Sequence, residues 1–464
     1  MDIIISNEIT IKKPTPAIIE WCKKELIVDN PEYEKKLRMG LWLGSTPQRL
    51  ALYKRYGESL ILPFGAFSYI KSIADANGEQ NSYKVDFTAN EPIDYKASVG
   101  LYDYQQEALR AMYMSKYGIL QSPAGSGKTQ IGIALAVALG KRCLWLTHTA
   151  DLLNQSYERA SQYIDKSLLG KITAGKVNIG SGITFATVQT LAKQDLSQYK
   201  YMWDVVIVDE CHRVAGTPTA LTQFSKVISN LACQHKYGLS ATVHRADGMI
   251  KCTYMLLGDI KYIVPDEAVK DRVMQVKIQR ANTGSAMPFE AIGTDGMINY
   301  TKLISCLADN GERNEVIWQN LTKEKEHYHL VLSDRLSQLY ALYDSLPEEL
   351  RAQASVIDGT MTSKKGKAER EQAIEDMRTG KKHFLFASYK LAKEGLDIPR
   401  LDRLHLATPQ KDYAIIVQSV GRIARTFEGK EQPVCYDYVD DFRMAENMYR
   451  TRCRHYKKCG CKGV

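Results

Sequence analysis

The sequence predicts an α/β protein with two tandem parallel-sheet lobes and a small N-terminal accessory domain. Two stretches, beginning near residues 118 and 326, alternate short apolar runs with segments of helix length. Continuous apolar strands joined by helices indicate parallel sheets that are covered on both faces. A length of 464 residues also leaves room for about three domains.

The first lobe is expected to span residues 98–262 and the second residues 326–445. Strands of the first lobe are expected at 118–120, 142–146, 183–185 and 205–208, with helices at 129–139 and 150–163. Strands of the second lobe are expected at 329–332, 354–357, 383–386, 403–406 and 434–436, with one helix ending at 346 and another at 366–378. Residues 1–97 form the accessory domain, 263–325 a connecting region and 446–464 a basic tail.

The composition is that of a soluble globular protein. Apolar residues make up 44% and charged residues 25%, which argues against disorder, a collagen-like repeat or a disulfide scaffold. The longest apolar run, Ile131 to Leu139, is too short to cross a bilayer. The first residues lack a secretion signal, and the ten dispersed cysteines fit reduced thiols. We therefore expect an intracellular protein without a membrane partner.

A phosphate-binding loop is predicted at residues 121–129, between a strand and a helix. Glycines let backbone N–H groups approach phosphates, and the N-terminus of the helix favours negative charge. Lys128 is expected to pair with the β- and γ-phosphates of ATP, and the Thr129 hydroxyl to bind Mg²⁺. The strict pattern has glycine where Ser122 stands. The residues expected to surround the phosphates are Gly125, Ser126, Gly127, Lys128 and Thr129.

Two adjacent carboxylates follow the apolar run 205–208. Asp209 and Glu210 are expected at the carboxyl end of a strand, the edge where open parallel sheets bind ligands. Asp209 suits Mg²⁺ coordination, and Glu210 suits a general base that polarises the attacking water. Together with the phosphate-binding loop, these residues predict hydrolysis of a nucleoside triphosphate.

These two sites, in this order, resemble those of the superfamily 2 helicases, and the resemblance extends over about residues 98–445. It implies two RecA-like lobes with ATP and Mg²⁺ as cofactors. Leu101 to Gln105 looks like the adenine-contacting element, with Gln105 contacting the base and Tyr102 standing where arginine is common. Asp209 to His212 is similar to the DExH box. Ser240, Ala241 and Thr242 match the motif that couples hydrolysis to strand movement, a role to which His212 also belongs.

The same resemblance implies further contacts in both lobes. The residues expected to contact nucleic acid are Thr147, Thr187, Gln189, Ser333, Arg335 and Ser388. Gly395 and Asp397 match a motif of the ATP site, and Gln418, Arg422 and Arg425 match the motif Q-x-x-G-R-x-x-R. The planar, always charged guanidinium suits phosphate oxygens. On successive helical turns, Arg422 and Arg425 are expected to act as arginine fingers.

Particular residues indicate the branch of the superfamily. DEAD-box helicases carry Asp where His212 stands and usually His where Gln418 stands. Residues 240–248, with Arg313 and Asn314, are similar to the XPB group and its phage UvsW-like relatives. That resemblance implies a DNA helicase or translocase that unwinds or remodels branched DNA in recombination, repair or replication. It also implies a monomer in the cytoplasm of a bacterial or phage-infected cell, with recombination or replication proteins as partners.

Several alternatives stay open at this point. One alternative is the motor subunit of a restriction system, which would need a partner nuclease and methyltransferase. Another is an RNA helicase outside the DEAD branch. A degenerate ATP switch that only binds nucleic acid is a third alternative, which the intact Lys128, Asp209, Glu210 and Arg422 argue against. By analogy with UvsW, residues 1–97 are expected to bind DNA; a structural cap on the first lobe is the other hypothesis.

The C-terminal segment concentrates positive charge. Residues 443–464 hold seven bases and one acid, out of a net charge of +9 for the whole chain. Such a segment predicts either a footprint for polyanions or a solvated helix face. Four potential zinc ligands lie there, Cys453, His455, Cys459 and Cys461. Their spacing is tighter than zinc sites usually have, so a basic terminal helix is the preferred interpretation.

Overall fold

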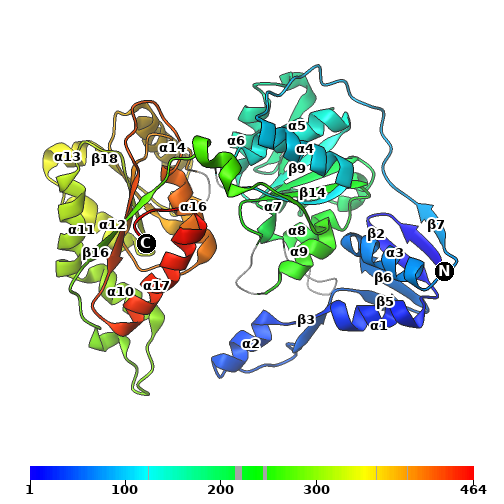
Figure 1. Ribbon diagram of the computed structural model, residues 1–464, viewed down its shortest axis with the longest axis horizontal. Helices are drawn as coiled ribbons and strands as arrows, with labels where there is room; N and C mark the ends of the chain where they lie inside the picture. Colours follow the sequence, from blue (N-terminus) through cyan, green and yellow to red (C-terminus); the bar gives the residue numbers. More distant parts are fainter. Residues whose placement is uncertain (124, 215–221, 244–247, 362, 394–395) are drawn as a thin grey trace. The chain divides into compact units, whose positions relative to one another are not determined.

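The computed structural model describes residues 1–123, 125–214, 222–243, 248–361, 363–393 and 396–464 (Figure 1). The chain divides into two compact units, the first comprising Met1–Pro123 and Gly127–Pro265 and the second Asp266–Val464. Each unit contains a mainly parallel sheet flanked by helices, so the predicted α/β class is confirmed.

The first unit contains an eight-stranded sheet in the order β11-β10-β12-β9-β13-β14-β8-β15. All neighbours are parallel except β10 and β11, which are antiparallel. The strands are β8 (Tyr117–Gln121), β9 (Cys143–Thr147), β10 (Leu169–Thr173), β11 (Lys176–Asn178), β12 (Ile183–Thr187), β13 (Val205–Asp209), β14 (His235–Ser240) and β15 (Ile260–Ile263). The helices are α4 (Asp103–Ser115), α5 (Lys128–Leu139), α6 (Ala150–Ala160), α7 (Val188–Leu191), α8 (Gln223–Ile228) and α9 (Ile250–Leu257).

The apolar runs of this lobe form the predicted strands. β9, β12 and β13 are buried at every position, as expected for strands covered on both faces. β14 is also fully buried, although it begins with His235 and Lys236 and therefore does not look apolar in the sequence. A central strand of the lobe was thus missed because two of its buried residues are basic.

The N-terminal residues fold into a separate five-stranded sheet in the order β5-β6-β2-β1-β7. Alternate residues of β1, β2 and β6 are buried, as in a sheet with one covered face. Its elements are β1 (Asp2–Ile5), β2 (Glu8–Lys12), α1 (Pro16–Glu25), β5 (Lys54–Tyr56), β6 (Ser59–Pro63), α3 (Phe67–Ala76) and β7 (Ser82–Val85). A two-stranded ribbon, β3 (Ile27–Asp29) and β4 (Arg49–Ala51), carries helix α2 (Pro31–Arg38).

This N-terminal sheet shares a hydrophobic core with helix α9 of the first lobe. Met249, Cys252 and Met255 pack in the same cluster as the apolar residues of β1, β2 and β6. A Cβ atom at Gly65 would lie 2.2 Å from the carbonyl oxygen of Tyr254, so only glycine permits this approach. The accessory domain is therefore fixed to the lobe by packing rather than tethered by a linker.

Lys236 of β14 is a buried cation at the same junction. Its Nζ donates to the backbone oxygen of Asn7 at 3.3 Å and lies 4.5 Å from the ring centroid of Phe64. Burial lowers the pKa of Lys236 to about 8, an effect that Cys233 and Glu8 partly oppose. The ammonium group of Lys236 is thus buried between the first lobe and the N-terminal sheet.

The second unit contains a six-stranded parallel sheet in the order β16-β21-β20-β17-β19-β18. The strands are β16 (Lys277–Asn282), β17 (His329–Ser333), β18 (Ala354–Ile357), β19 (Phe384–Ser388), β20 (Arg403–Leu406) and β21 (Val434–Val439). The helices are α10 (Tyr300–Asp309), α11 (Gly311–Lys323), α12 (Leu336–Asp344), α13 (Glu348–Ala352), α14 (Lys364–Thr379), α15 (Tyr389–Lys393), α16 (Tyr413–Ile423) and α17 (Arg443–Lys458). The stretch 263–325, expected as a connection, supplies β16, α10 and α11 of this unit.

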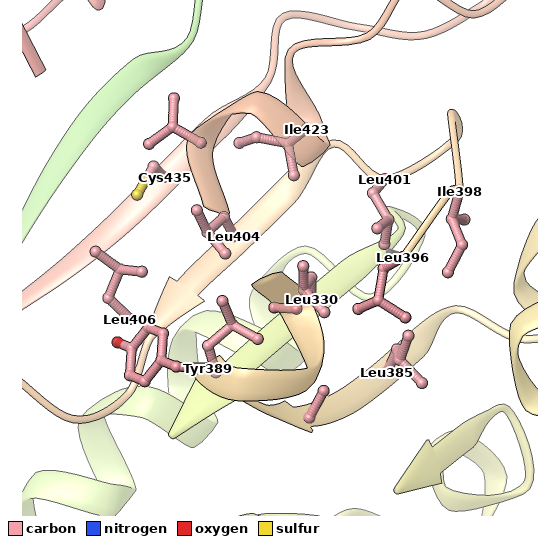
Figure 2. Close-up of a cluster of buried hydrophobic side chains, with 14 of the residues drawn as sticks. Leu330, Leu385, Tyr389, Leu396, Ile398, Leu401, Leu404, Leu406, Ile423 and Cys435 are labelled. Atoms are coloured by element: carbon pink, nitrogen blue, oxygen red, sulfur yellow. The ribbon is translucent and has the colours of Figure 1, made fainter. Parts of the chain in front are cut away.

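One apolar cluster anchors the sequence motifs of this unit. Figure 2 shows Leu396 and Ile398, from the loop after α15, in the same cluster as Leu385 of β19 and Ile423 of α16. All four side chains are buried. The loop and the helix that carry the two expected ATP-contacting motifs are therefore held on the same core.

The basic C-terminal segment is built into this unit as helix α17. Arg452 is buried and donates to both carboxylate oxygens of Asp437, at 2.7 and 2.6 Å, and the Tyr456 hydroxyl donates to the same carboxylate at 2.7 Å. The predicted terminal helix exists, and one of its bases neutralises a buried acid.

The cysteines of the chain form no disulfides, and four of the residues in the tail are potential zinc ligands by sequence. All ten cysteines have free thiols. Burial raises the pKa of Cys459 and of Cys461 to about 12, and His455 Nε2 lies 3.3 Å from the backbone oxygen of Lys411. Within the described ranges, no three His, Cys, Asp or Glu side chains gather in a way that suits a metal ion.

No helix in the described part of the chain has the length and apolar character of a membrane span.

Candidate nucleotide and nucleic-acid site

Three neighbouring strand ends bring the first-lobe motifs together. Ser240 of β14 lies opposite Gln121 of β8, and the Ser122 N–H donates to the Ser240 carbonyl at 2.9 Å. On the other side of β14, Leu239 lies opposite Asp209 of β13. The phosphate-binding loop, the paired carboxylates and the Ser-Ala-Thr motif therefore start at one edge of the sheet.

The loop between β8 and α5 has the backbone of a phosphate cradle. Gly125 and Gly127 have φ values of +81° and +79°, in the region that favours glycine. A Cβ atom at Gly127 would lie 2.4 Å from Nε2 of Gln105, so the loop passes directly against that amide. Lys128 begins α5, which points the N-terminus of a twelve-residue helix at this turn.

Gln105 is held where the adenine-contacting element was expected. It is buried in the first turn of α4, and its Oε1 accepts from the Tyr102 N–H at 3.0 Å. Tyr102 itself is exposed and its ring stacks on Tyr104. The element expected to contact the base thus adjoins the loop expected to hold the phosphates.

Of the paired carboxylates, Asp209 is buried and Glu210, which is partly exposed, has a strained backbone. Burial and the neighbouring Glu210 raise the pKa of Asp209 to about 7, and Lys128 opposes this shift. Glu210 has φ +50° and ψ +49°, a left-handed conformation that costs about 1–3 kcal/mol in a residue other than glycine. A cation beside Asp209 would stabilise its charged form, and the oxygens of Asp209 and Thr129 are the donors that Mg²⁺ prefers. The residues present therefore fit a bound magnesium nucleotide.

A chain of side chains connects the carboxylates to the Ser-Ala-Thr motif. The Nδ1 atom of His212 lies 3.3 Å from Oε2 of Glu210 and 2.9 Å from Oγ of Ser240. The Ser240 hydroxyl donates to the carbonyl oxygen of Thr242 at 2.8 Å, across Ala241. His212 and Ser240 are buried, so these contacts are shielded from water. His212 thus lies between the Glu210 carboxylate and the Ser-Ala-Thr motif, and the coupling of hydrolysis to that motif stays a prediction.

The first-lobe residues expected to contact nucleic acid lie at two adjacent strand ends. Thr147 ends β9 and lies opposite Thr187, which ends β12. The Thr147 hydroxyl donates to the Thr149 carbonyl at 3.0 Å, and the Thr187 hydroxyl to Oγ1 of Thr190 at 2.9 Å. Gln189 is exposed and donates to the His148 carbonyl at 2.6 Å. The two threonines shape these loops, and their contact with nucleic acid stays a prediction.

Of the second-lobe residues expected to contact nucleic acid, Ser333 ends strand β17 and Arg335 follows it. The buried Ser333 hydroxyl donates to Oε1 of Gln338 at 2.7 Å and accepts from the Arg335 N–H at 3.0 Å. The Arg335 guanidinium is fixed by Oγ of Ser305 at 2.9 Å. Ser388 ends the neighbouring strand β19, and its Oγ accepts from the Leu391 N–H at 3.4 Å. Ser333 and Ser388 are opposite each other in the sheet, so the predicted residues share one edge.

The arginines of the second lobe are placed against the motif that contains Asp397. Arg422 donates to the carbonyl oxygens of Ala392 and Leu396 at 3.1 and 3.0 Å. Arg425 forms an ion pair with Asp397. Gln418 is buried one turn before Arg422 on α16. Gly395 lies outside the described residues.

Arg425 corrects one expectation, that both arginines lie on successive turns of a helix. Helix α16 ends at Ile423, and Arg425 forms a β-bridge with Val273. Beyond the end of the helix, Lys430 Nζ donates to the carbonyl oxygens of Ile423 at 2.8 Å and of Arg425 at 2.7 Å. Burial lowers the pKa of Lys430 to about 8. No motif in the sequence pointed to this lysine, which binds the backbone beside the Arg425 side chain.

Comparison with known families covers both lobes. The model described as "Type III restriction enzyme, res subunit" matches residues 98–245, and the "Helicase conserved C-terminal domain" matches residues 312–427. Together they cover more than half of the chain. The chain belongs to the superfamily 2 helicases. The helicase domains indicate an enzyme with ATP-dependent helicase activity.

Relatives of this helicase come from viruses and cells. The chain is 28% identical to the putative ATP-dependent RNA helicase L396 of Acanthamoeba polyphaga mimivirus over 351 residues, which cover 74% of the chain and 64% of that relative. It is 23% identical to the ATP-dependent DNA helicase uvsW of Enterobacteria phage T4 over 461 residues, covering 92% of the chain and 87% of the relative. The chain spans less than two thirds of the mimivirus protein.

A solved structure shares the fold of the helicase. A fragment of a putative HsdR subunit of a type I restriction enzyme from Vibrio vulnificus YJ016 matches with a TM-score of 0.55 and 16% sequence identity. The match covers 91% of this chain and 79% of that chain. At this identity the likeness concerns the fold alone.

Proposed function

We propose that this helicase is an ATP-driven DNA translocase that unwinds or remodels branched DNA. The observation that carries the proposal is the connected path from Glu210 through His212 to Ser240, at the edge where the phosphate-binding loop begins. A site that only bound ATP would not need its general base joined to a motif outside the nucleotide pocket. This arrangement supports a mechanical role for ATP hydrolysis.

The residues of the chain have separate tasks in this proposal. Lys128 binds phosphate oxygens and Glu210 accepts a proton from the attacking water. Asp209 and Thr129 hold Mg²⁺, which neutralises phosphate charge when bound. Arg422 and Arg425 add positive charge for the transition state, and Gln418 orients the same site. The expected nucleic-acid contacts are to backbone phosphates, so little dependence on base sequence is expected.

The descriptions of two relatives support DNA as the substrate. The uvsW relative is described as a DNA helicase, and a 23% identical relative from Sulfurisphaera tokodaii is described as the DNA 3'-5' translocase XPB2. The mimivirus relative is described as a putative RNA helicase, which makes RNA the second candidate substrate. We propose a monomer that acts with recombination or replication proteins.

A substrate panel tests the proposal. ATP hydrolysis and strand separation are measured with single strands, forks, four-way junctions and RNA duplexes. We expect four-way junctions and forks to give the highest activity, and the Glu210→Gln variant to lose turnover on all of them. A preference for RNA duplexes would move the assignment to an RNA helicase. ATP turnover by Glu210→Gln at the wild-type rate would refute Glu210 as the base.

A further inference from the structure

The two-stranded ribbon of the N-terminal domain ends in an exposed apolar tip, which comprises helix α2 and the loop 39–48. Helix α2 and the following loop lie between the paired strands β3 and β4 (Figure 1). Asn30 caps α2 by accepting from the Glu32 N–H at 3.0 Å, and its Nδ2 donates to the Pro47 carbonyl at 2.7 Å. The Asn30 N–H also donates to the Gln48 carbonyl at 3.0 Å. The two ends of the loop are thus tied at the base of the ribbon.

The loop itself presents the indole ring of Trp42. Gly40 and Gly44 both have positive φ, at +61° and +52°, and they enclose the sequence Leu41-Trp42-Leu43. A Cβ atom at Gly44 would lie 2.9 Å from Cζ3 of Trp42, so the ring rests on the glycine backbone. Trp42 is nevertheless 89% exposed, the most exposed of the large apolar side chains among the described residues. One side of the ring is supported, and most of its surface faces solvent.

Positive charge predominates in the segment around this ring, although Arg49 lies 3.7 Å from Asp29 and Lys36 forms an ion pair with Glu32 at 2.9 Å. Residues 35–49 hold four bases and no acid. Lys35, Arg38 and Arg49 are exposed, whereas Lys36 donates to Oγ1 of Thr46 at 2.7 Å and braces the loop. The acids of α2 lie in its first turn, at the end away from the loop. A rigid aromatic platform with bases on both sides in the sequence suits a ligand with a flat ring and negative charges.

We propose that this tip is a nucleic-acid site in which Trp42 stacks on an unpaired base while Lys35, Arg38 and Arg49 bind the adjoining phosphates. Stacking on an aromatic side chain tolerates any base, and phosphate contacts add affinity that falls with salt. A base inside a duplex is already stacked, so the tip selects single-stranded segments such as those at a fork. The inference rests on the proposed function, and it adds a contact outside both helicase lobes.

Tryptophan fluorescence tests the site directly. The full-length protein is titrated, without nucleotide, with oligo(dT), a fork with single-stranded arms and a blunt duplex. We expect quenching by oligo(dT) and by the fork but not by the duplex, and loss of that quenching component in Trp42→Phe, which keeps an aromatic ring. Quenching that is unchanged in Trp42→Phe, or equal with the blunt duplex, would overturn the proposal.

Affinity variants separate the ring from the charges. Trp42→Ala should weaken oligo(dT) binding by roughly tenfold, since one stacked base contributes a loss of that order. Trp42→Phe should recover most of it, and a double Lys35→Gln, Arg38→Gln variant should flatten the salt dependence. Phe289→Ala is the matched control, because Phe289 is a similarly exposed aromatic residue of the second unit. An equal loss in Phe289→Ala would refute a specific role for Trp42.

Two further measurements separate this inference from the proposed function and from a lipid ligand. ATP turnover without DNA should be unchanged in Trp42→Ala, and Glu210→Gln should keep the quenching although it loses turnover. Quenching with no DNA-stimulated turnover in the wild type would refute the proposed function and leave the site standing. Vesicles of phosphatidylserine that quench Trp42 while oligo(dT) does not would overturn the site, because they would identify a membrane ligand.

Discussion

At the scale of single residues, two features of the expected ATP site lower the stability of the first lobe. Glu210 has a left-handed backbone, and Asp209 is a carboxyl whose burial raises its pKa. Both features reduce the stability of the folded chain, and the Mg²⁺ ion of a bound nucleotide would offset the second by stabilising the Asp209 carboxylate. Lys128 provides only part of that compensation in the chain alone.

The Lys128→Ala variant is expected to lose ATP hydrolysis, because the phosphates lose their cation. Binding of DNA without nucleotide should survive, since Lys128 lies outside the residues expected to contact nucleic acid. Steady-state turnover and a fluorescence binding titration measure the two properties. Hydrolysis near the wild-type rate would refute the phosphate-binding assignment.

For Arg422→Ala we expect slower turnover with little change in ATP affinity. An arginine finger acts on charge that develops in the transition state, so kcat falls more than binding does. Single-turnover rates and nucleotide titrations give the two numbers. An equal loss of rate and affinity would identify Arg422 as a ground-state contact.

At the scale of helices and strands, buried charges join elements to their neighbours. Arg452 connects α17 to β21 through Asp437, and Lys236 connects β14 to the N-terminal sheet. Both are basic residues in positions where a sequence pattern predicts solvent exposure. Because both side chains are buried in these contacts, we expect them to stabilise the fold rather than to bind DNA.

Arg452→Ala should destabilise the second unit by about 3–5 kcal/mol, because Asp437 is left charged and buried without its partner. Arg454 is exposed on the same helix, so Arg454→Ala should change the free energy of unfolding by less than about 0.5 kcal/mol. Urea denaturation followed by circular dichroism measures both. It follows that deleting 443–464 tests stability before it tests DNA binding.

The stability contributed by Lys236 is expected to depend on pH. Its pKa is about 8 in the folded chain against an ordinary 10.5, so between these values the unfolded chain holds a proton that the folded chain has released. The wild type should therefore gain stability over Lys236→Met as pH rises from 8 to 10.5, by up to about 3 kcal/mol. Below pH 8 the difference should be constant. Unfolding free energies of both proteins at several pH values check the slope.

The sequence predicted those elements whose burial is visible in apolar residues. All nine expected strands of the two lobes exist, and Thr147, Thr187, Asp209, Ser333 and Ser388 lie at the carboxyl ends of five of them. β14 was missed because His235 and Lys236 interrupt its apolar pattern. In the N-terminal sheet only the apolar run at 60–65 indicated a strand, which is β6, because the other strands are short and alternate. Contacts such as Lys430 with the carbonyls of Ile423 and Arg425 depend on tertiary position, which no local pattern encodes.

At the scale of the whole molecule, the N-terminal residues and the first lobe form one unit. The accessory sheet packs on α9, which follows the Ser-Ala-Thr motif in sequence. The hypothesis of a cap on the first lobe and that of a DNA-binding domain are therefore compatible: the body of the sheet covers α9, and the ribbon with Trp42 projects from it.

Removing residues 1–85 should destabilise the first lobe, because Met249, Cys252 and Met255 would lose the apolar side chains that bury them. Calorimetry of the truncated chain should show a lower melting temperature for that lobe and an unchanged transition for the second unit. A truncated chain that melts like the full-length protein would show that the sheet is only loosely attached.

The missing side chain of Gly65 has a consequence for engineering. Backbone meets backbone there, with no room for even a methyl group. Anyone who wishes to transplant the first eighty-five residues onto another motor would have to move α9 along with them. The boundary for a chimera accordingly lies inside the ATPase core, not at the junction that the order of the motifs suggests.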